Sequence, residues 1–314
     1  MRGLEIEARS EGRLQVAEPA RGKRLDQEAQ GGARTEAGPV RERSHEQPEA
    51  RGNRAREQDP RRERVSFEDR KRQAVTDVAT YRVVSVKDLV EERFGGNAFA
   101  ARRGIEQLKR KGLLKERTVQ VGRGKSFKVL TATKQGVEQA RENDPGGPQR
   151  YFSGLVKPNE LRHDTAVYRA SRAEISKIEQ QGGTVTRVRL DYELKSRVAR
   201  ASERARARQG DEEARQARMA AARELELPVD EQGRVSYPDA QIEYTDEQGM
   251  SGRVDVEVTS GHYCSRDIQA KAAAGFALHA NGRQAARRLA LSLDPEGSQR
   301  GGGGPRRNDD LLEI

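Results

Sequence analysis

The chain carries two acidic residues whose types and spacing suit metal-assisted phosphate chemistry. Asp239 and Glu257 fall in segments 238–244 and 253–259, where polar and apolar residues alternate, and this alternation predicts two adjoining strands. If the polar faces of these strands adjoin, the two carboxylates converge. Paired carboxylates can hold a magnesium ion, which activates a water and steadies a phosphate. The alternative is an antiparallel pair with one wet face, where acidic residues are routine.

A lysine on the next predicted helix can reach the same place. The helix is expected over residues 265–280, with small and apolar residues along its inward side. The inward residues are Ile268, Ala272, Gly275, Phe276 and His279. Lys271 lies at the edge of that side, so its ammonium group is a candidate partner for the two carboxylates. Asp239, Glu257 and Lys271 are therefore the candidate catalytic residues of a possible Mg²⁺ site, and the antiparallel pair with one wet face remains the alternative.

These residues need a folded unit to position them, and the sequence predicts one over residues 151–293. Its first helix is expected at 161–181, and a strand of alternating polarity follows at 184–192. A helix rich in Ala, Arg and Glu over 196–226 has only a thin apolar side, so we expect it to stand outside the core. The two acidic strands, the lysine helix and a last strand at 289–293 complete the order helix, strand, excursion, strand, strand, helix, strand.

The N-terminal half shows a different pattern, over residues 66–142. Ser66-Phe67-Glu68-Asp69 is a capping box, in which side chains satisfy the free backbone amides at a helix start. Further helices are expected to open at Ser85, Asn97 and about Thr133. Before the last helix the period switches to two, which predicts a hairpin around Gly122-Arg123-Gly124. Three helices, a basic hairpin and a closing helix make a winged helix-turn-helix, whose usual partner is double-stranded DNA.

The third of these helices is the predicted recognition helix, which would present its outward face to the major groove of DNA. Ala101, Ile105 and Leu108 recur at helical spacing and are expected to face inward. Arginines on the outward face can pair with guanine edges or hold phosphates. The candidate DNA-binding residues of the helix and the hairpin are Asn97, Phe99, Arg102, Arg103, Lys109, Arg110, Arg123, Lys125 and Lys128. The alternatives are that these side chains only solvate one face, or that the winged helix binds a protein.

Composition narrows the remaining choices. The chain has 314 residues and a net charge of +10, which favours a polyanionic partner. Only 33% of the residues are hydrophobic, so we expect a disordered arm at 1–65, a linker at 143–150 and a flexible tail at 294–314. Cys264 is the single cysteine, which points to a reducing cytoplasm, and we expect it to be a small packed residue. No apolar run in the sequence reaches the length needed to cross a membrane.

The acidic strands also resemble a known pattern. Tyr237-Pro238-Asp239-Ala240, followed by Val256-Glu257-Val258-Thr259 and then Lys271, is similar to the motif of PD-(D/E)XK nucleases. The resemblance implies that Asp239 and Glu257 bind the metal ion, with Asp255 as an additional ligand, and that Lys271 faces the phosphate. Thr259 occupies the position where that motif has its lysine, so Lys271 would be a lysine relocated to the helix.

The two halves together resemble the replication-relaxation family, whose members join a winged helix to a nuclease-like domain. Leu161-Arg162-His163-Asp164 adds to this resemblance, which covers about 66–293. It implies a role in the replication, relaxation or mobilisation of a plasmid or integrative element. The implied partners are double-stranded DNA and replication or mobilisation proteins, with a homodimer as one expected assembly. The expected fold class is α/β (α+β): an N-terminal winged helix, then a nuclease-like αβββαβ domain, with disordered termini.

Three hypotheses about function remain open. The first is a DNA-binding accessory protein of a mobile element, and the second is a magnesium-dependent endonuclease targeted by its winged helix. The third is a winged-helix transcriptional regulator whose second domain mediates dimerisation. Thr259 in the lysine position favours the first over the second, while the convergence of Asp239 and Glu257 argues against the third.

Two other polar residues near these motifs have competing interpretations. His163 beside Asp164 is a candidate catalytic pair, although such residues more often brace the start of a helix. Tyr263 is not expected to be a nucleophile of the relaxase type, because the chain has only 4 His and they do not cluster.

Overall fold

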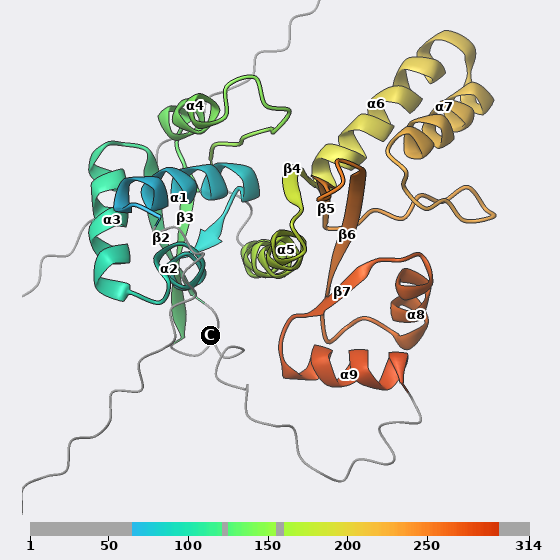
Figure 1. Ribbon diagram of the computed structural model, residues 1–314. Coiled ribbons are helices and arrows are strands. Elements are labelled where there is room, and N and C mark those ends of the chain that lie inside the picture. Colours follow the sequence, from blue (N-terminus) through green and yellow to red (C-terminus); the bar gives the residue numbers. More distant parts are fainter. Residues whose placement is uncertain (1–64, 121–124, 155–159, 295–314) are drawn as a thin grey trace, which may run out of the picture. The chain divides into compact units, whose positions relative to one another are not determined.

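The computed structural model describes residues 65–120, 125–154 and 160–294 (Figure 1). Helices and two sheets make up this part of the chain, so the mixed α/β class predicted from the sequence is confirmed. Three predicted segments lie outside the described residues: the arm at 1–65 except its last residue, the hairpin tip with Arg123, and the tail except its first residue. No helix in the described ranges is both long and apolar enough to span a bilayer.

The first half of the described chain contains four helices and a small sheet. Its elements are α1 (Phe67–Tyr81), β1 (Val84–Ser85), α2 (Val86–Phe94), α3 (Ala98–Arg110), β2 (Leu114–Gln120), β3 (Ser126–Ala132) and α4 (Lys134–Asn143). β2 and β3 pair antiparallel, and β1 pairs with the other side of β3. The three helices, the hairpin and the closing helix follow the predicted order. The sequence does not predict β1, because Val84 pairs with Leu130, which is distant along the chain.

Side-chain caps explain where the helices of this half begin. Ser66, Ser85, Asn97 and Thr133 each accept a hydrogen bond, 3.0–3.1 Å long, from a backbone amide three residues later. Such bonds satisfy amides that have no partner inside the helix. Gly95 ends α2 in the left-handed conformation, with a φ of 59°, which glycine adopts without steric cost. The predicted helix starts are therefore confirmed.

The second half is built on a four-stranded sheet. Its elements are α5 (Leu161–Gln180), β4 (Thr184–Leu190), α6 (Asp191–Gln209), α7 (Asp211–Glu224), β5 (Ala240–Thr245), β6 (Ser251–Thr259), α8 (Ser265–Ala273), β7 (Ala277–Ala280) and α9 (Arg283–Leu293). The strand order is β4-β5-β6-β7, with antiparallel pairing except between β6 and β7, which are parallel. The first six elements of the predicted order (helix, strand, excursion, strand, strand, helix) are found, whereas the predicted last strand is not, and α9 ends this half.

The end of this half differs from the prediction in two ways. The predicted helix at 265–280 stops at Ala273, because Gly275 turns the chain with a φ of 83° and the residues after it form β7. His279 is therefore a strand residue and not part of the inward side of a helix. The predicted strand at 289–293 is the last part of α9, which has Ala285 and Ser292, seven residues apart, as its buried positions. That spacing is two helical turns.

The polar excursion is a helical hairpin. It begins at Asp191, earlier than predicted, and Gly210, with a φ of 108°, separates α6 from α7. Figure 1 shows the two helices side by side, and they share a small core of their own. The buried residues of this core are Leu194, Val198, Ala221, Ala222, Leu225 and Leu227. The few apolar side chains of this segment are thus buried mainly in the contact between α6 and α7.

One hydrophobic cluster joins both halves. Ala240 and Ile242 of β5, together with Val256 and Val258 of β6, are buried in it with residues of α5. The same cluster contains apolar residues of α1, α2 and α3. The apolar faces of the acidic strands are therefore turned toward this core, as their alternation predicts, and the polar residues between them are turned away from it.

Candidate functional site

The predicted pair of carboxylates meets where β5 begins and β6 nears its end. Ala240 pairs with Val256, so the continued register sets Asp239 opposite Glu257. The backbone amide of Val258 donates a 2.8 Å hydrogen bond to Asp239 Oδ2, which fixes this carboxylate against β6. The two acidic side chains thus lie on neighbouring strands at one end of the sheet.

Glu257 is almost fully buried, with 2% of its side chain exposed. Its Oε1 accepts a 2.7 Å hydrogen bond from the Tyr263 hydroxyl and lies 2.8 Å from Lys271 Nζ. Its Oε2 is buried without a hydrogen-bond partner among the described residues. A carboxylate oxygen left without a partner in a protein interior is costly, and a bound cation or water is a common explanation. Glu257 Oε2 is therefore the oxygen of this site that is free to bind a cation.

Lys271 reaches the carboxylates from α8, as the sequence predicts. Besides pairing with Glu257, its Nζ donates a 3.0 Å hydrogen bond to the carbonyl oxygen of Tyr237. It also lies 4.8 Å from the centroid of the Phe276 ring. The side chain is 21% exposed, so Lys271 is partly open to solvent. It can face a phosphate while it remains close to Glu257.

His163 adds a further side chain from the start of α5. Its Nε2 lies 3.0 Å from Asp239 Oδ1. The hydrogen bond to Asp239 raises the pKa of the histidine against the opposing effect of burial, and nearby carboxylates add to the increase. The sequence suggests Asp164 as its partner, whereas the structure joins His163 to Asp239. We call the set of His163, Asp239, Glu257, Tyr263 and Lys271 the carboxylate site.

The carboxylate site brings two acidic side chains together with two basic ones. Burial raises the pKa of the Glu257 carboxyl, and the charge of Asp239 raises it further, while Lys271 and Tyr263 act in the opposite direction. Burial also raises the pKa of the Tyr263 hydroxyl. The hydroxyl therefore stays protonated and donates a hydrogen bond to Glu257. Each carboxylate thus has one basic partner, His163 for Asp239 and Lys271 for Glu257.

The donor set fits a magnesium ion in its chemistry. Mg²⁺ in proteins is held by one or two carboxylates and keeps several waters. Among the described residues, no group of three or more His, Cys, Asp and Glu is arranged to hold a metal. If an ion binds at the carboxylate site, Asp239 and Glu257 are the residues that would hold it, with water or substrate oxygens as its remaining ligands.

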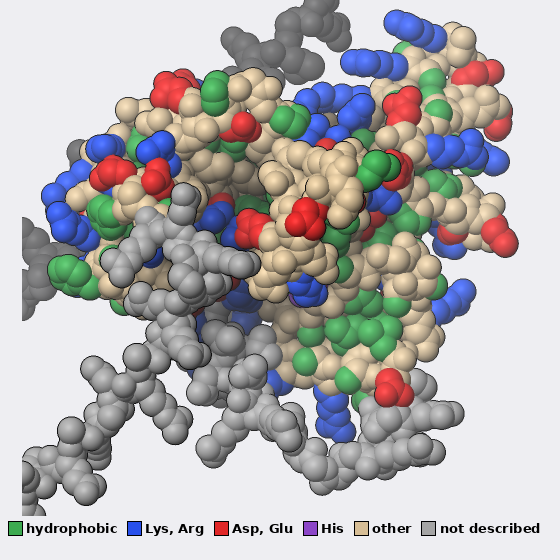
Figure 2. Space-filling view, in the orientation of Figure 1, with side chains coloured by type: hydrophobic (Ala, Val, Ile, Leu, Met, Phe, Trp, Pro, Cys, Tyr) green, Lys and Arg blue, Asp and Glu red, His purple; other side chains and the backbone are tan. Residues whose placement is uncertain are grey.

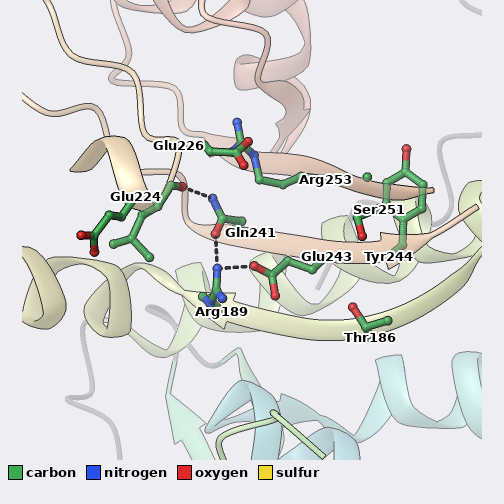
Figure 3. A pocket seen from close by; sticks show the side chains of 11 residues that line it. Thr186, Arg189, Glu224, Glu226, Gln241, Glu243, Tyr244, Ser251 and Arg253 are labelled. Carbon is green, nitrogen blue, oxygen red and sulfur yellow. Dashed lines mark hydrogen bonds and ion pairs between the residues drawn. The ribbon is translucent and has the colours of Figure 1, made fainter. Parts of the chain in front are cut away.

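Asp255, the predicted additional ligand, is engaged elsewhere on the same strand face. Its Oδ1 accepts a 3.1 Å hydrogen bond from Gln241, and its Oδ2 lies 3.3 Å from Arg253 Nε. Gln241 is also bonded to Arg189, and Figure 3 shows Arg189 between Gln241 and Glu243. These side chains form a network beside a pocket of about 360 Å³. The contacts of Asp255 are thus separate from those of the carboxylate site.

The sequence does not predict the role of the loop after β6. Tyr263 belongs to that loop and donates to Glu257, six residues earlier. The available signal is that a loop leading from the end of β6 into α8 must pass close to the last residues of the strand. Cys264, which we expect to be packed, is exposed, because it precedes α8 on the solvent side of this loop.

The predicted recognition helix α3 has two clearly different sides. Ala101, Ile105 and Leu108 are buried, as their spacing predicts. Arg102 and Arg103 are exposed, and the side chain of Phe99 is 79% exposed. A fully solvated helix rarely exposes a phenylalanine, because contact between its apolar ring and water is unfavourable. The exposed side of α3 thus combines an aromatic ring with two basic side chains.

The other candidate DNA-binding residues fall into two groups. Lys109 and Lys128 both pair with Glu116, at 3.1 and 2.8 Å, so their charges are partly neutralised. The side chain of Asn97 caps α3. Arg110 and Lys125 are exposed and make no ion pair within the described residues. Arg123 lies outside the described residues.

Comparison with known protein families finds no family whose pattern this chain matches. A search of curated proteins likewise finds no relative. The assignment of a function therefore rests on the two surfaces described above.

Proposed function

We propose that the protein binds double-stranded DNA through a winged helix-turn-helix formed by α1 to α4 and the β2–β3 hairpin. In this proposal it acts as an accessory protein in the replication, relaxation or mobilisation of a plasmid or integrative element. The observation that carries the DNA-binding part is the exposed side of α3, where Phe99, Arg102 and Arg103 lie opposite a buried apolar stripe. The role in a mobile element rests on the resemblance between the sequence and the replication-relaxation family.

The chemistry of the α3 side supports DNA over a protein partner. Arg102 makes no ion pair or hydrogen bond within the described part of the chain, and Arg103 lies 5.7 Å from the centroid of the Phe67 ring. Guanidinium groups held in this way can bind phosphates or pair bidentately with guanine. Arg110, at the end of the same helix, adds a charge where the DNA backbone would pass. The formal charge of +10 favours the same class of partner.

The test is a titration of a labelled DNA duplex at several salt concentrations. The variant Arg102→Ala/Arg103→Ala should bind more weakly, and the slope of log affinity against log salt should fall by about 0.9 for each phosphate that the variant no longer neutralises. A matched control is Arg206→Ala/Arg234→Ala, which removes the same charge from two exposed ion pairs. Equal affinity and slope in wild type and the α3 variant would refute the assignment of α3 as the recognition helix.

A second candidate function is a magnesium-dependent DNA endonuclease, favoured by the carboxylate site. When bound there, the ion would activate a water and stabilise negative charge on the phosphate. The chain itself contributes Asp239, oriented by His163 and by the Val258 amide, and Lys271, which is close enough to solvent to face a phosphate. Thr259, at the position of the motif lysine, donates to the carbonyl oxygen of His279 instead. This bond is structural, which favours DNA binding over cleavage.

Cleavage is tested by incubating supercoiled plasmid with increasing magnesium. If the site is catalytic, nicking should require magnesium and disappear in Asp239→Asn and Glu257→Gln. Asp255→Asn is the matched control, because it removes a carboxylate from the same strand face outside the carboxylate site. Calorimetric titration with magnesium alone reports binding of the ion independently of cleavage. DNA binding without any nicking would leave the accessory role as the function.

A further inference from the structure

Helix α6 carries a row of arginines along one side. The row consists of Arg197, Arg200, Arg204 and Arg208. Their separations of three, four and four residues return each side chain to nearly the same side of the helix. We call these four residues the arginine row. It lies beside the face of α6 that packs on α7 and not within it.

The arginine row is accessible and unpaired. All four side chains are exposed, and none has a hydrogen bond or an ion pair within the described residues. Two other arginines of the hairpin differ, since Arg206 pairs with Asp211 at 2.8 Å and Arg218 donates to the carbonyl oxygen of Gly233. Figure 2 shows Lys and Arg side chains projecting from this hairpin into solvent. Some arginines of the hairpin therefore have partners, whereas the four of the row have none within the described residues.

A row of like charges lowers the stability of the helix that carries it. Arginines three or four residues apart repel each other, at a cost of roughly 0.2–0.5 kcal/mol per pair. The row contains three such neighbouring pairs. In the described structure, no acidic side chain forms an ion pair with any of the four arginines that would offset this repulsion. An anionic partner would remove this cost, because it would turn repulsion into attraction.

We propose that the arginine row is a second DNA-binding surface, which holds the phosphate backbone of a duplex without reading its sequence. This inference rests on the proposed function and extends it from α3 to the second half of the chain. The row spans eleven residue steps, or about 16 Å at the rise of an α-helix. Duplex DNA carries one negative charge per roughly 1.7 Å of its axis, so several phosphates lie within reach of four arginines.

A lipid surface fits the arginine row less well than DNA does. Helices that lie on membranes bury an apolar face in the lipid. The apolar residues of α6, including Leu194 and Val198, are already buried against α7. The exposed large hydrophobic residues of the described chain are Val65, Phe99, Met250, Leu291 and Leu293, and none of them is on the hairpin. The hairpin thus offers charge without an apolar face.

The start of α6 links the arginine row to the carboxylate site. The amide of Asp191, the first residue of α6, donates a 3.0 Å hydrogen bond to the carbonyl oxygen of Asp239. One turn later, Lys195 experiences the charges of Asp239 and Glu257, which raise its pKa together with its bond to Asp191 and against the effect of burial. The row begins at Arg197, two residues after this lysine. A duplex held along α6 would therefore pass close to the carboxylate site.

The test compares two double variants that remove the same charge. Arg200→Gln/Arg204→Gln removes the centre of the row, and Arg206→Gln/Arg234→Gln removes two ion-paired arginines of the same region. Gln has nearly the helix propensity of Arg, so the fold of α6 should be kept, which circular dichroism checks. Binding is measured with a labelled duplex of unrelated sequence. For the row variant, the slope of log affinity against log salt should be smaller than for wild type by about 1.8, which is 0.9 for each of two lost phosphate contacts. Its affinity should be about tenfold lower or more at ~0.1 M salt. The control variant should match wild type.

The outcomes separate this inference from the proposed function. If wild type binds no duplex, the proposed function fails. If Arg102→Ala/Arg103→Ala weakens binding while the row variant equals its control, the proposed function stands and the second surface is refuted. Loss of binding to phosphatidylserine vesicles in the row variant, with duplex binding unchanged, would also refute it and assign the row to a membrane. Higher thermal stability of the row variant without DNA would support the argument that the row is kept at a cost.

Discussion

Glu257 is a buried carboxyl group whose surroundings raise its pKa. Burial and the charge of Asp239 both disfavour its ionised form, and Lys271 with Tyr263 restores only part of the loss. Its Oε2 has no partner in the described structure. Such an arrangement is expected where a protein accepts a local cost to keep a ligand position. The cost should be visible as a dependence of stability on pH.

We predict that Glu257→Gln changes the pH dependence of unfolding. The pKa of Glu257 is raised in the folded state, so its contribution to stability is fully present below the ordinary value of 4.5 and is lost as pH rises through the folded value. The free energy of unfolding of wild type, relative to Glu257→Gln, should therefore fall with rising pH, by about 1.4 kcal/mol for each unit by which the pKa is raised. Urea titrations across this pH range measure it, with Glu138→Gln on the exposed side of α4 as control. Parallel pH profiles for wild type and Glu257→Gln would contradict this.

The sequence predicts this site only as far as regular patterns reach. Alternation within the strands places Asp239 and Glu257 on the polar face, and helical spacing brings Lys271 to the edge of α8. His163 and Tyr263 join the site through a helix start and a loop, where neither period applies. Asp255 alternates with Glu257 and shares its face, yet Gln241 and Arg253 determine where its carboxylate points. Periodicity gives the face of a strand and not the partner of each side chain.

At the scale of elements, helix starts follow local chemistry, while short strands depend on distant partners. Ser66, Ser85 and Asn97 act within three residues, so the sequence alone predicts them. β7 could not be predicted in the same way, because its four residues are a strand only through parallel pairing with β6. The alternating apolar residues at 289–293 favour a strand, but no neighbouring strand is paired with them in the described structure, and they complete α9.

The contact of α4 with the chain before β2 depends on a glycine, and we predict that Gly136→Ala is destabilising. A methyl group at this position would lie 2.2 Å from the carbonyl oxygen of Leu113. That carbonyl cannot easily move, because it accepts a 3.0 Å hydrogen bond from the Thr133 amide. Alanine normally favours a helix over glycine by about 1 kcal/mol, but overpacking costs about 1–3 kcal/mol, and here the clash is with backbone.

We therefore expect Gly136→Ala to lower the free energy of unfolding by about 2 kcal/mol, as measured by urea titration. The control Glu138→Ala changes an exposed residue of the same helix and should stay within about 0.5 kcal/mol of wild type. A Gly136→Ala protein as stable as the control would mean that α4 can shift away from Leu113.

At the scale of the whole molecule, the described halves share more than the sequence suggests. The sequence predicts a linker at 143–150, but the chain makes a contact immediately after it. Tyr151 is buried, and the amide of Phe152 donates a 2.8 Å hydrogen bond to the carbonyl oxygen of Ala79 in α1. The Pro and Gly residues of 143–150 indicate a loop. They do not indicate which part of the protein the following residues contact.

A buried polar contact also crosses between the halves and should make them unfold together. Asp77 of α1 accepts hydrogen bonds of 2.6 and 2.7 Å from the Arg93 guanidinium of α2 and one of 2.7 Å from the Tyr168 hydroxyl of α5. Asp77→Ala would leave both donors buried without their acceptor, at a cost of about 3–5 kcal/mol. Because apolar residues of α1, α5 and β6 belong to one cluster, this cost should reach both halves.

Hydrogen exchange followed by mass spectrometry can test this, since peptides from α3 and from β6 report on the two halves separately. In wild type, the slowest amides of both peptides should exchange with the same free energy of opening. In Asp77→Ala, both values should fall by the same amount, whereas Glu91→Ala, an exposed change on α2, should leave them unchanged. If protection fell in α3 and persisted in β6, the halves would be separate cooperative units, and the shared core would not couple them. A common fall would mean that α3 and the carboxylate site belong to one cooperative folding unit.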